Sequence, residues 1–90
     1  MRFTLGRIVA TPGAIKALEQ AGQSSPADFL ERHSTGDWGE VDDEDKQENE
    51  FSVENGLRIL SAYTTRSGDK IWLITEADRS LTTILLPHEY

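Results

Sequence analysis

The sequence predicts an α+β fold with the element order β-α-α-α-β-β-β, in which a three- to four-stranded antiparallel sheet packs on helices. The 90 residues, 37% of them hydrophobic and 28% charged, suffice for one hydrophobic core, so residues 1–90 are expected to form a single domain. Helix-starting signals follow residue 10, and the last third of the chain is rich in Ile, Leu, Thr and aromatic residues. These observations together favour helices followed by a sheet.

Composition excludes several classes of protein. Cysteine is absent, which rules out disulfide scaffolds, thiolate zinc sites and cysteine nucleophiles. No apolar run approaches the roughly 18 residues of a membrane span, and residues 1–7 lack the apolar region of a signal peptide. We therefore expect a cytoplasmic protein without membrane contact.

The amino-terminal third predicts a strand and a helix. Phe3 and Leu5 alternate with polar residues at a period close to two, which is typical of a strand. Thr11 and Pro12 suit the N-cap and first position of a helix, and Gly22 would end it. The apolar residues between them follow helical spacing: Ala14, Ile15, Leu18 and Ala21.

Two further helices are predicted before the sheet. Ser25 and Pro26 repeat the N-cap and first-position pattern, and this helix should end near His33 or Ser34. A third helix is predicted from Asp42 or Asp43 to Glu54, with Asn55-Gly56 ending it. Its periodicity is the weakest of the three, because it offers few apolar contacts: Val41, Phe51 and Val53.

Three strands are predicted at Leu57–Thr64, Lys70–Glu76 and Ser80–Leu86. Short turns at residues 66–69 and 77–79 make them an antiparallel meander, to which the first strand can add at an edge. Residues 71–74 are apolar on both faces, as expected of a central strand covered on both sides or nearly so. We expect two helices to cover one face.

Negative charge is concentrated in one segment. Residues 36–55 hold nine acidic residues and one lysine, a net −8, whereas the whole chain carries −7. Such a segment repels phosphate backbones and favours a basic partner surface, although it is also what a solvated helix face looks like. The nine Lys and Arg residues are scattered without a basic stripe, so direct DNA binding is not expected.

A small set of residues could carry catalysis. His33 could act as a general acid or base, with Glu76 or Asp78 as the second catalytic group and Arg79 or Arg58 on a phosphate. The same residues have structural interpretations: the histidine at the negative end of a helix, the acids and arginines in turns and surface pairs. No cofactor motif is present.

The acidic segment also bears on metal and partner binding. Consecutive acids on a helix point in different directions, and the calcium-loop spacing is missing, so no metal site is predicted. Trp38, between two glycines, could pack in the core or be exposed for recognition. If the segment binds a protein partner, the candidate contact residues are Asp37, Trp38, Glu40, Asp42, Asp43 and Asp45.

Three blocks of the sequence carry a family resemblance. They are Arg32-His33-x-x-Gly36-Asp37-Trp38-Gly39, residues 71–80 (IWLITEADRS) and residues 82–87 (TTILLP). The chain resembles a family of short bacterial plasmid-related proteins of no established activity, some of which are labelled subunits of type I restriction enzymes. The resemblance implies carriage on plasmids or integrative elements. The restriction label does not fit, because this chain has neither the length nor the Asn/Asp-Pro-Pro-Tyr/Phe-like motif of a methyltransferase.

The sequence leads to two functional hypotheses. The first is a non-enzymatic interaction protein of a mobile element that binds a basic protein partner, with mimicry of nucleic-acid charge as one variant. The second is a small metal-independent ribonuclease that uses His33, since helices followed by a meander are similar to the architecture of barnase- and RelE-like ribonucleases. The oligomeric state, monomer or homodimer, stays open at this point.

Overall fold

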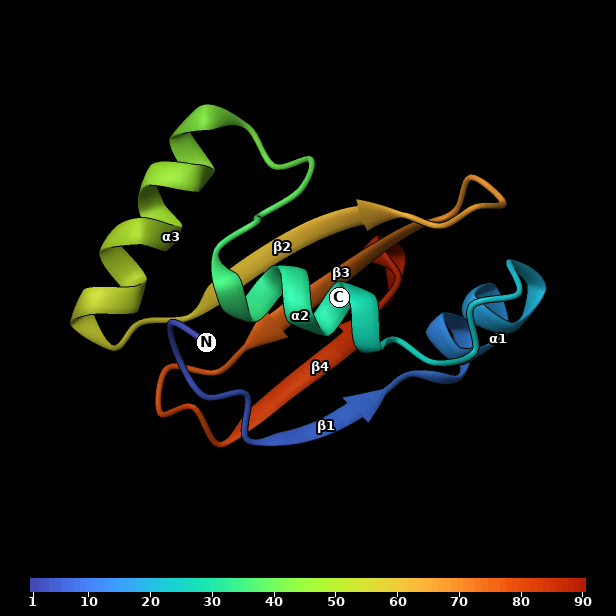
Figure 1. The fold of residues 1–90 in the computed structure, drawn as a ribbon, viewed down its shortest axis with the longest axis horizontal. Helices are drawn as coiled ribbons and strands as arrows, with labels where there is room; N and C mark the ends of the chain where they lie inside the picture. Colours follow the sequence, from blue (N-terminus) through green and yellow to red (C-terminus); the bar gives the residue numbers. More distant parts are fainter.

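The computed structural model describes residues 1–90 and confirms the predicted element order (Figure 1). The elements are β1 (Arg7–Ala10), α1 (Pro12–Gln20), α2 (Ala27–Thr35), α3 (Asp43–Asn55), β2 (Ile59–Thr64), β3 (Lys70–Thr75), β4 (Leu81–Leu85) and a 3-10 turn (Pro87–Glu89).

The four strands form one mixed sheet in the order β1-β4-β3-β2. Strands β2, β3 and β4 form the predicted antiparallel meander. Strand β1 pairs with β4 in parallel, so the sheet is mixed and not antiparallel throughout as predicted. Three helices and two strands separate β1 from β4, and a connection of that length leaves the direction of pairing free.

Strand β1 also begins later than predicted, at Arg7, because the chain bends at Gly6. Gly6 has a φ of +65°, and a Cβ there would lie 2.4 Å from the Arg79 carbonyl oxygen. Phe3 and Leu5 consequently lie outside the sheet, and Phe3 packs in the core.

Helices α1 and α2 have well-defined ends. The Thr11 hydroxyl accepts a hydrogen bond from the Ala14 amide (3.1 Å), as predicted for the N-cap of α1. Helix α2 begins one residue later than predicted, with Pro26 at the N-cap and no capping side chain. It also continues past Ser34 to Thr35, because Gly36 adopts a φ of +92° and ends it.

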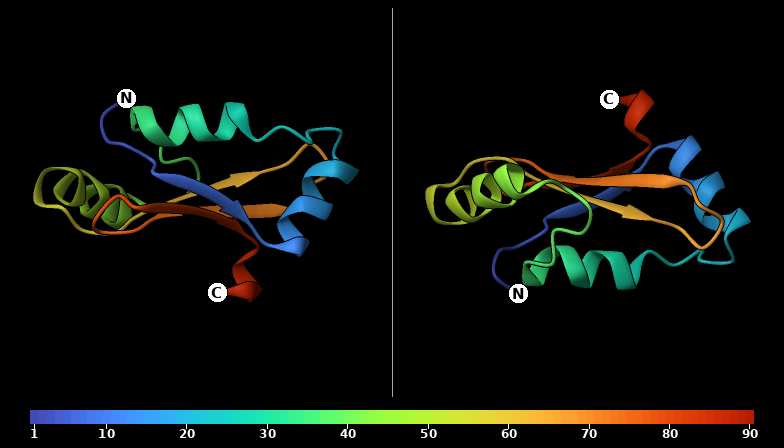
Figure 2. Two further views of the ribbon diagram at one scale, coloured as in Figure 1. Left: turned by 90° about the horizontal axis from the view of Figure 1, so that it is seen from below. Right: turned by 90° about the horizontal axis from the view of Figure 1, so that it is seen from above.

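The main core lies between the sheet and two helices. Figure 2 shows α2 along one face of the sheet and α1 at one end of it. Side chains of both helices pack on that face, as expected, in a cluster of seven buried residues: Ala14, Leu18, Phe29, Tyr63, Ile71, Leu73 and Ile84. A second, smaller cluster beside it consists of Phe3, Trp38 and Ile59, with Leu5, Val41 and Val53 at its margin.

Helix α3 packs along the edge of the sheet formed by β2 (Figure 1). The buried Asn49 amide replaces a neighbouring strand there: its Nδ2 donates to the Leu60 carbonyl (2.7 Å), and its Oδ1 accepts from the Leu60 amide (3.2 Å). Further along the edge, Gly39 forms an isolated parallel bridge with Ala62. Phe51, predicted as an apolar contact of this helix, is instead 57% exposed.

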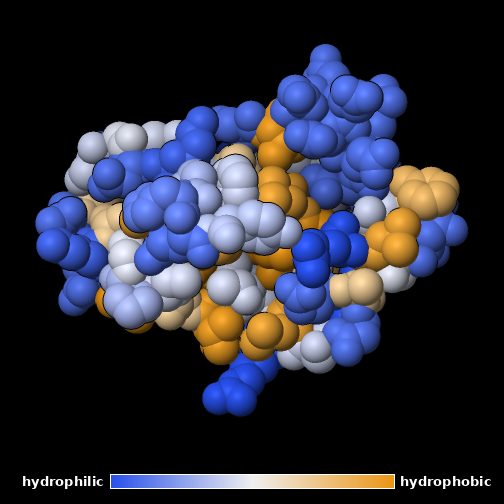
Figure 3. Space-filling model, turned by 180° about the vertical axis from the view of Figure 1, so that it is seen from behind, coloured by the Kyte–Doolittle hydropathy of each residue, from blue (hydrophilic) through white to orange (hydrophobic).

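The C-terminal 3-10 turn lies against β3 on the sheet face opposite α2, and no α-helix covers that face, which Figure 3 shows from behind with hydrophobic residues through its middle. We call it the open face; because side chains alternate along strands, it carries Leu60, Ala62, Trp72, Ile74, Thr83 and Leu85. Three of these residues are nonetheless buried: Ile74 is 3% exposed, and Ala62 and Leu85 are each 5% exposed. Tyr90 packs on this face: its ring centre lies 5.9 Å from that of Trp72, edge to face, and it lines one pocket together with Ile74.

Candidate functional site

His33, the candidate acid or base, lies in the core with 0% exposure. Both ring nitrogens have hydrogen-bond partners: Nδ1 lies 2.6 Å from the Ser61 hydroxyl and Nε2 lies 2.9 Å from the Thr75 hydroxyl. Thr75 continues the chain to Thr82 (2.7 Å), which donates to the Leu5 carbonyl (2.7 Å).

The last member of this chain determines the direction of every bond in it. Because Thr82 donates its only hydroxyl proton to a carbonyl, Thr75 donates to Thr82, and His33 Nε2–H donates to Thr75. When the ring is neutral, Nδ1 carries no proton and accepts from Ser61. Burial lowers the pKa of His33 to about 4, which agrees with a neutral ring.

A serine 2.6 Å from an imidazole nitrogen resembles a nucleophile–base pair, but this pair has no access to a substrate. Ser61, Thr75 and Thr82 are all fully buried, like His33. The network therefore satisfies polar groups inside the core and holds α2 on the strands.

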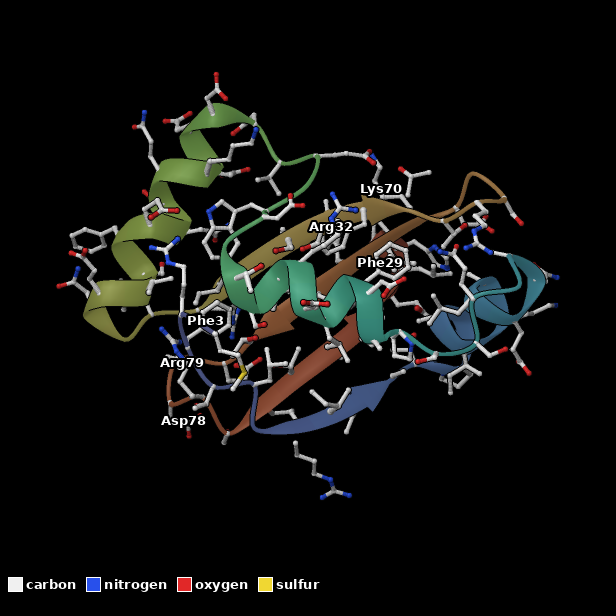
Figure 4. The ribbon with its side chains drawn as sticks, viewed as in Figure 1. Phe3, Phe29, Arg32, Lys70, Asp78 and Arg79 are labelled. Atoms are coloured by element: carbon white, nitrogen blue, oxygen red, sulfur yellow. The ribbon has the colours of Figure 1, made fainter.

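Arg79, the candidate phosphate-binding residue, is engaged by backbone carbonyls. Its guanidinium donates to the carbonyls of Leu57 (2.7 Å) and Ser52 (2.8 Å), which ties the end of α3 to the β3–β4 turn. Figure 4 shows it beside Phe3, whose ring centre is 5.6 Å from the guanidinium carbon. Phe3 also contacts His33 edge-on and thus lies between the two candidate catalytic side chains.

The two candidate acids point elsewhere. Glu76 follows Thr75 on the opposite face of the sheet and pairs with Arg58 (3.2 Å). Asp78 lies at the tip of the hairpin, where it accepts from the Ser80 hydroxyl (2.6 Å) and amide (3.0 Å). The structure therefore does not bring the predicted ribonuclease residues together.

In the Gly-Asp-Trp-Gly loop (residues 36–39) the charged side chain is exposed and the tryptophan is buried. Trp38 is 4% exposed and donates its indole N–H to Glu50 (3.0 Å), so the structure places it in the core, one of the two positions that the sequence left open, and not on the surface as a contact residue. Asp37 is exposed and pairs with Arg32 (2.7 Å), whose hydrogen bond keeps the pKa of that carboxyl below its usual value. Glu40 is also exposed and pairs with Lys70 (3.3 Å).

The remaining acids of the segment divide into one paired residue and a larger unpaired group. Glu50 accepts two hydrogen bonds from Arg2 (2.7 and 2.9 Å) and one from Trp38, and these lower its pKa to about 2. The other acids of the segment are exposed and form no ion pair: Asp42, Asp43, Glu44, Asp45, Glu48 and Glu54. Asp42 also caps α3 by accepting from the Asp45 amide (2.8 Å).

Part of this unpaired charge lines a hollow. A groove of about 430 Å³ runs between α3 and β2, and we call it the acidic groove; its lining is Glu44, Asp45, Glu48, Asn49, Arg58 and Leu60. Glu44 and Glu48 were not among the predicted contact residues. Their i, i+4 spacing was the signal that places them on one side of the helix.

The molecule thus combines a closed core with one strongly charged helix at the edge of its sheet. No three side chains of the types that bind metals come together, and no helix is long and apolar enough to cross a membrane. No protein-family model, curated protein or solved structure matches the chain.

Proposed function

We propose that this chain is a non-enzymatic interaction protein that binds a protein partner with a basic surface through α3. The observation that carries the proposal is the row of six unpaired, exposed carboxylates from Asp42 to Glu54, where Lys46 is the only base. Charges without a partner in the free molecule remain available to a partner's Lys and Arg residues.

The spacing of these charges supports the variant in which α3 mimics nucleic acid. Residues 42–54 extend over roughly 18 Å at the helical rise and carry six unpaired carboxylates, an average of one about every 3 Å of helix axis, with four of them at the start of the helix. One strand of DNA carries one phosphate charge about every 3.4 Å. Given the resemblance to plasmid-related proteins, we further propose a mobile-element protein whose target is a nucleic-acid-binding protein of the host.

The exposed Asp37 and Glu40 extend the acidic surface beyond α3, although each already has an internal partner. An exposed ion pair contributes little to stability, so either acid can exchange its arginine or lysine for a partner's at small cost. We therefore expect these two residues to add less to binding than the unpaired acids do.

Affinity capture from host lysate tests the proposal. The tagged chain should retain a partner at about 0.1 M salt and lose it near 1 M, where screening reaches about 3 Å. Neutralising α3 (Asp42→Asn, Asp43→Asn, Glu44→Gln, Asp45→Asn) should remove the partner; asparagine at position 42 still caps the helix.

A matched control removes the same charge from exposed acids elsewhere: Glu19→Gln, Asp28→Asn, Glu31→Gln and Asp69→Asn. This control should retain the partner. The proposal would be contradicted if the amount of captured partner did not depend on salt, or if both variants lost the partner equally. Either result would show that net charge or another surface binds the partner.

A further inference from the structure

Two hollows meet on the open face. Beside the acidic groove lies a pocket of about 160 Å³, which we call the apolar pocket, lined by Arg58, Ile74, Glu76, Thr83, Leu85 and Tyr90. Arg58 lines both hollows, and Leu60 of the groove pairs in register with Ile74 of the pocket. The two hollows therefore form one surface, apolar on the sheet and acidic at α3.

The apolar part of this surface has the width of one helix. Its side chains form two rows across three strands, Leu60–Ile74–Thr83 and Ala62–Trp72–Leu85, in which Leu60, Trp72 and Thr83 are half-buried and the other three are buried. Three strands about 4.8 Å apart span roughly 10 Å, which is close to the diameter of an α-helix. Tyr90, 70% exposed, stands at the margin, and its hydroxyl accepts a hydrogen bond from Arg58 (2.9 Å).

Charge complementarity indicates which helix fits. Glu44, Asp45 and Glu48 line the side of the surface that α3 forms, and none of them has an ion-pair partner in the free protein. A helix on the sheet would lie against these carboxylates along one flank. That flank needs Lys or Arg residues, and the side facing the sheet needs an apolar stripe.

A second copy of this chain does not meet those requirements. Each of its helices contains one lysine or arginine only: Lys16 in α1, Arg32 in α2 and Lys46 in α3. The last two are surrounded by acids on their own helix, and each copy carries a net charge of −7. Self-association through this surface would oppose like charges.

We propose that the open face and the acidic groove together bind a basic amphipathic α-helix of a partner protein, with an apolar residue in the apolar pocket. This inference rests on the proposed function, because it assigns the kind of partner segment that the acidic α3 takes. It adds the sheet face as the source of apolar contact and Tyr90 as the margin of the site.

The two tryptophans report on the site independently. Trp72 lies on the open face, whereas Trp38 is buried on the other side of the sheet. In a ¹H–¹⁵N spectrum of the full chain, a helical Leu/Lys peptide with one apolar stripe should shift the Trp72 indole and the amides of residues 44–48. The Trp38 indole should stay in place. Trp72→Phe assigns the two signals.

A Ser/Lys peptide of equal charge is the control for the probe. It should bind at least about tenfold more weakly, since it leaves the apolar surface in water. If both peptides shift α3 equally and neither shifts Trp72, the helix site is wrong while the acidic interaction surface stands. If neither peptide shifts any signal, both proposals fail.

Variants locate the contact on the protein. Leu60→Ser and Tyr90→Ser should each weaken binding of the Leu/Lys peptide, by about tenfold for the leucine. Ile15→Ser removes an exposed apolar side chain of α1 that lines neither hollow, and should leave the affinity unchanged. Because Tyr90 is largely exposed, its variant tests the site even if Leu60→Ser unfolds. Unchanged affinity in the Tyr90 variant, or equal losses in all three variants, would overturn the proposal.

Discussion

His33 illustrates how a residue type that suggests catalysis can serve structure alone. Burial keeps its ring neutral, and four hydroxyl and imidazole groups satisfy one another away from water. A charged imidazole in this position would lose most of its hydration. The residue therefore links stability to pH instead of transferring protons to a substrate.

The first prediction concerns that link. Burial lowers the pKa of His33 to about 4, while the unfolded chain has an ordinary value near 6.5. Below pH 6.5 the unfolded state binds more protons than the folded state. The stabilisation is thus complete above pH 6.5 and is lost as the pH falls toward 4. Between pH 7 and pH 5 the free energy of unfolding should fall by about 2 kcal/mol.

Urea unfolding at a series of pH values measures this slope. The window above pH 5 keeps most carboxylates ionised in both states, so the slope reports on histidine. His88→Asn alters the other histidine, which is exposed, and should preserve the slope. His33→Asn should flatten it whatever its effect on overall stability. A slope that persists in His33→Asn would assign the pH dependence to another group.

At the scale of elements, the loop before α3 decides how the acidic helix sits on the sheet. The Gly39–Ala62 bridge, the bond from the Glu40 amide to the Ala62 carbonyl (2.7 Å) and the Asn49–Leu60 pair occupy the free edge of β2. An edge satisfied in this way offers no template for another strand. Partners therefore meet side chains on this side of the molecule.

Gly39 is the position in this loop where no other residue fits. Its φ is +74°, and a Cβ there would lie 2.0 Å from the Ala62 carbonyl oxygen. Gly56 is a matched control, because its φ is +65° but no atom lies within 4 Å of the added Cβ. Gly56→Ala should cost about 1 kcal/mol of left-handed strain. Gly39→Ala should cost at least about 2 kcal/mol more, since two bridge hydrogen bonds are lost. Equal losses of unfolding free energy would show that contact with β2 is unimportant.

Local signals sufficed for most elements, and long-range contacts account for the misses. Thr11 marks a boundary through its side-chain hydroxyl, and Gly56 and Gly68 do so through their backbone freedom, so α1, the end of α3 and the β2–β3 turn could be predicted. The parallel pairing of β1 could not, because it depends on where Gly6 meets Ser80 across the fold. Likewise, nothing local indicates that Asn49 pairs with Leu60.

The candidate site was predictable in charge but not in shape. The count of acids in residues 36–55 sufficed to identify the acidic segment. The inward orientation of Trp38 depends on Phe3 and Glu50, which lie 35 residues before it and 12 after it, and the acidic groove needs Arg58 and Leu60 beside α3. These are tertiary contacts, which periodicity along the chain does not report.

For the whole molecule, the arrangement of charge favours repulsion over attraction. Four ion pairs lie on the surface, each with both partners substantially exposed, and such pairs contribute between about 0 and 1 kcal/mol. Against them stand a net charge of −7 and the like-charged i, i+4 pairs Glu44–Glu48 and Glu50–Glu54 on α3. The largest dimension of the molecule is 36 Å, so at low salt nearly all of these charges interact.

Salt should therefore stabilise the folded protein. Raising the salt concentration from about 0.01 M to 0.15 M shortens the screening distance from about 30 Å to about 8 Å, which weakens repulsion across the molecule more than contacts within ion pairs. Like charges about 10 Å apart in water repel by roughly 0.4 kcal/mol, so several such pairs amount to about 1 kcal/mol. Urea unfolding at both salt concentrations should show an increase of this order in the free energy of unfolding.

Two pairs of substitutions test whether α3 causes this increase. Glu48→Gln with Glu54→Gln should reduce the increase, whereas Glu31→Gln with Asp69→Asn, which removes equal charge away from α3, should reduce it less. A decrease in stability with salt would mean that attraction within the four ion pairs outweighs repulsion among the acids of α3, and would contradict this prediction.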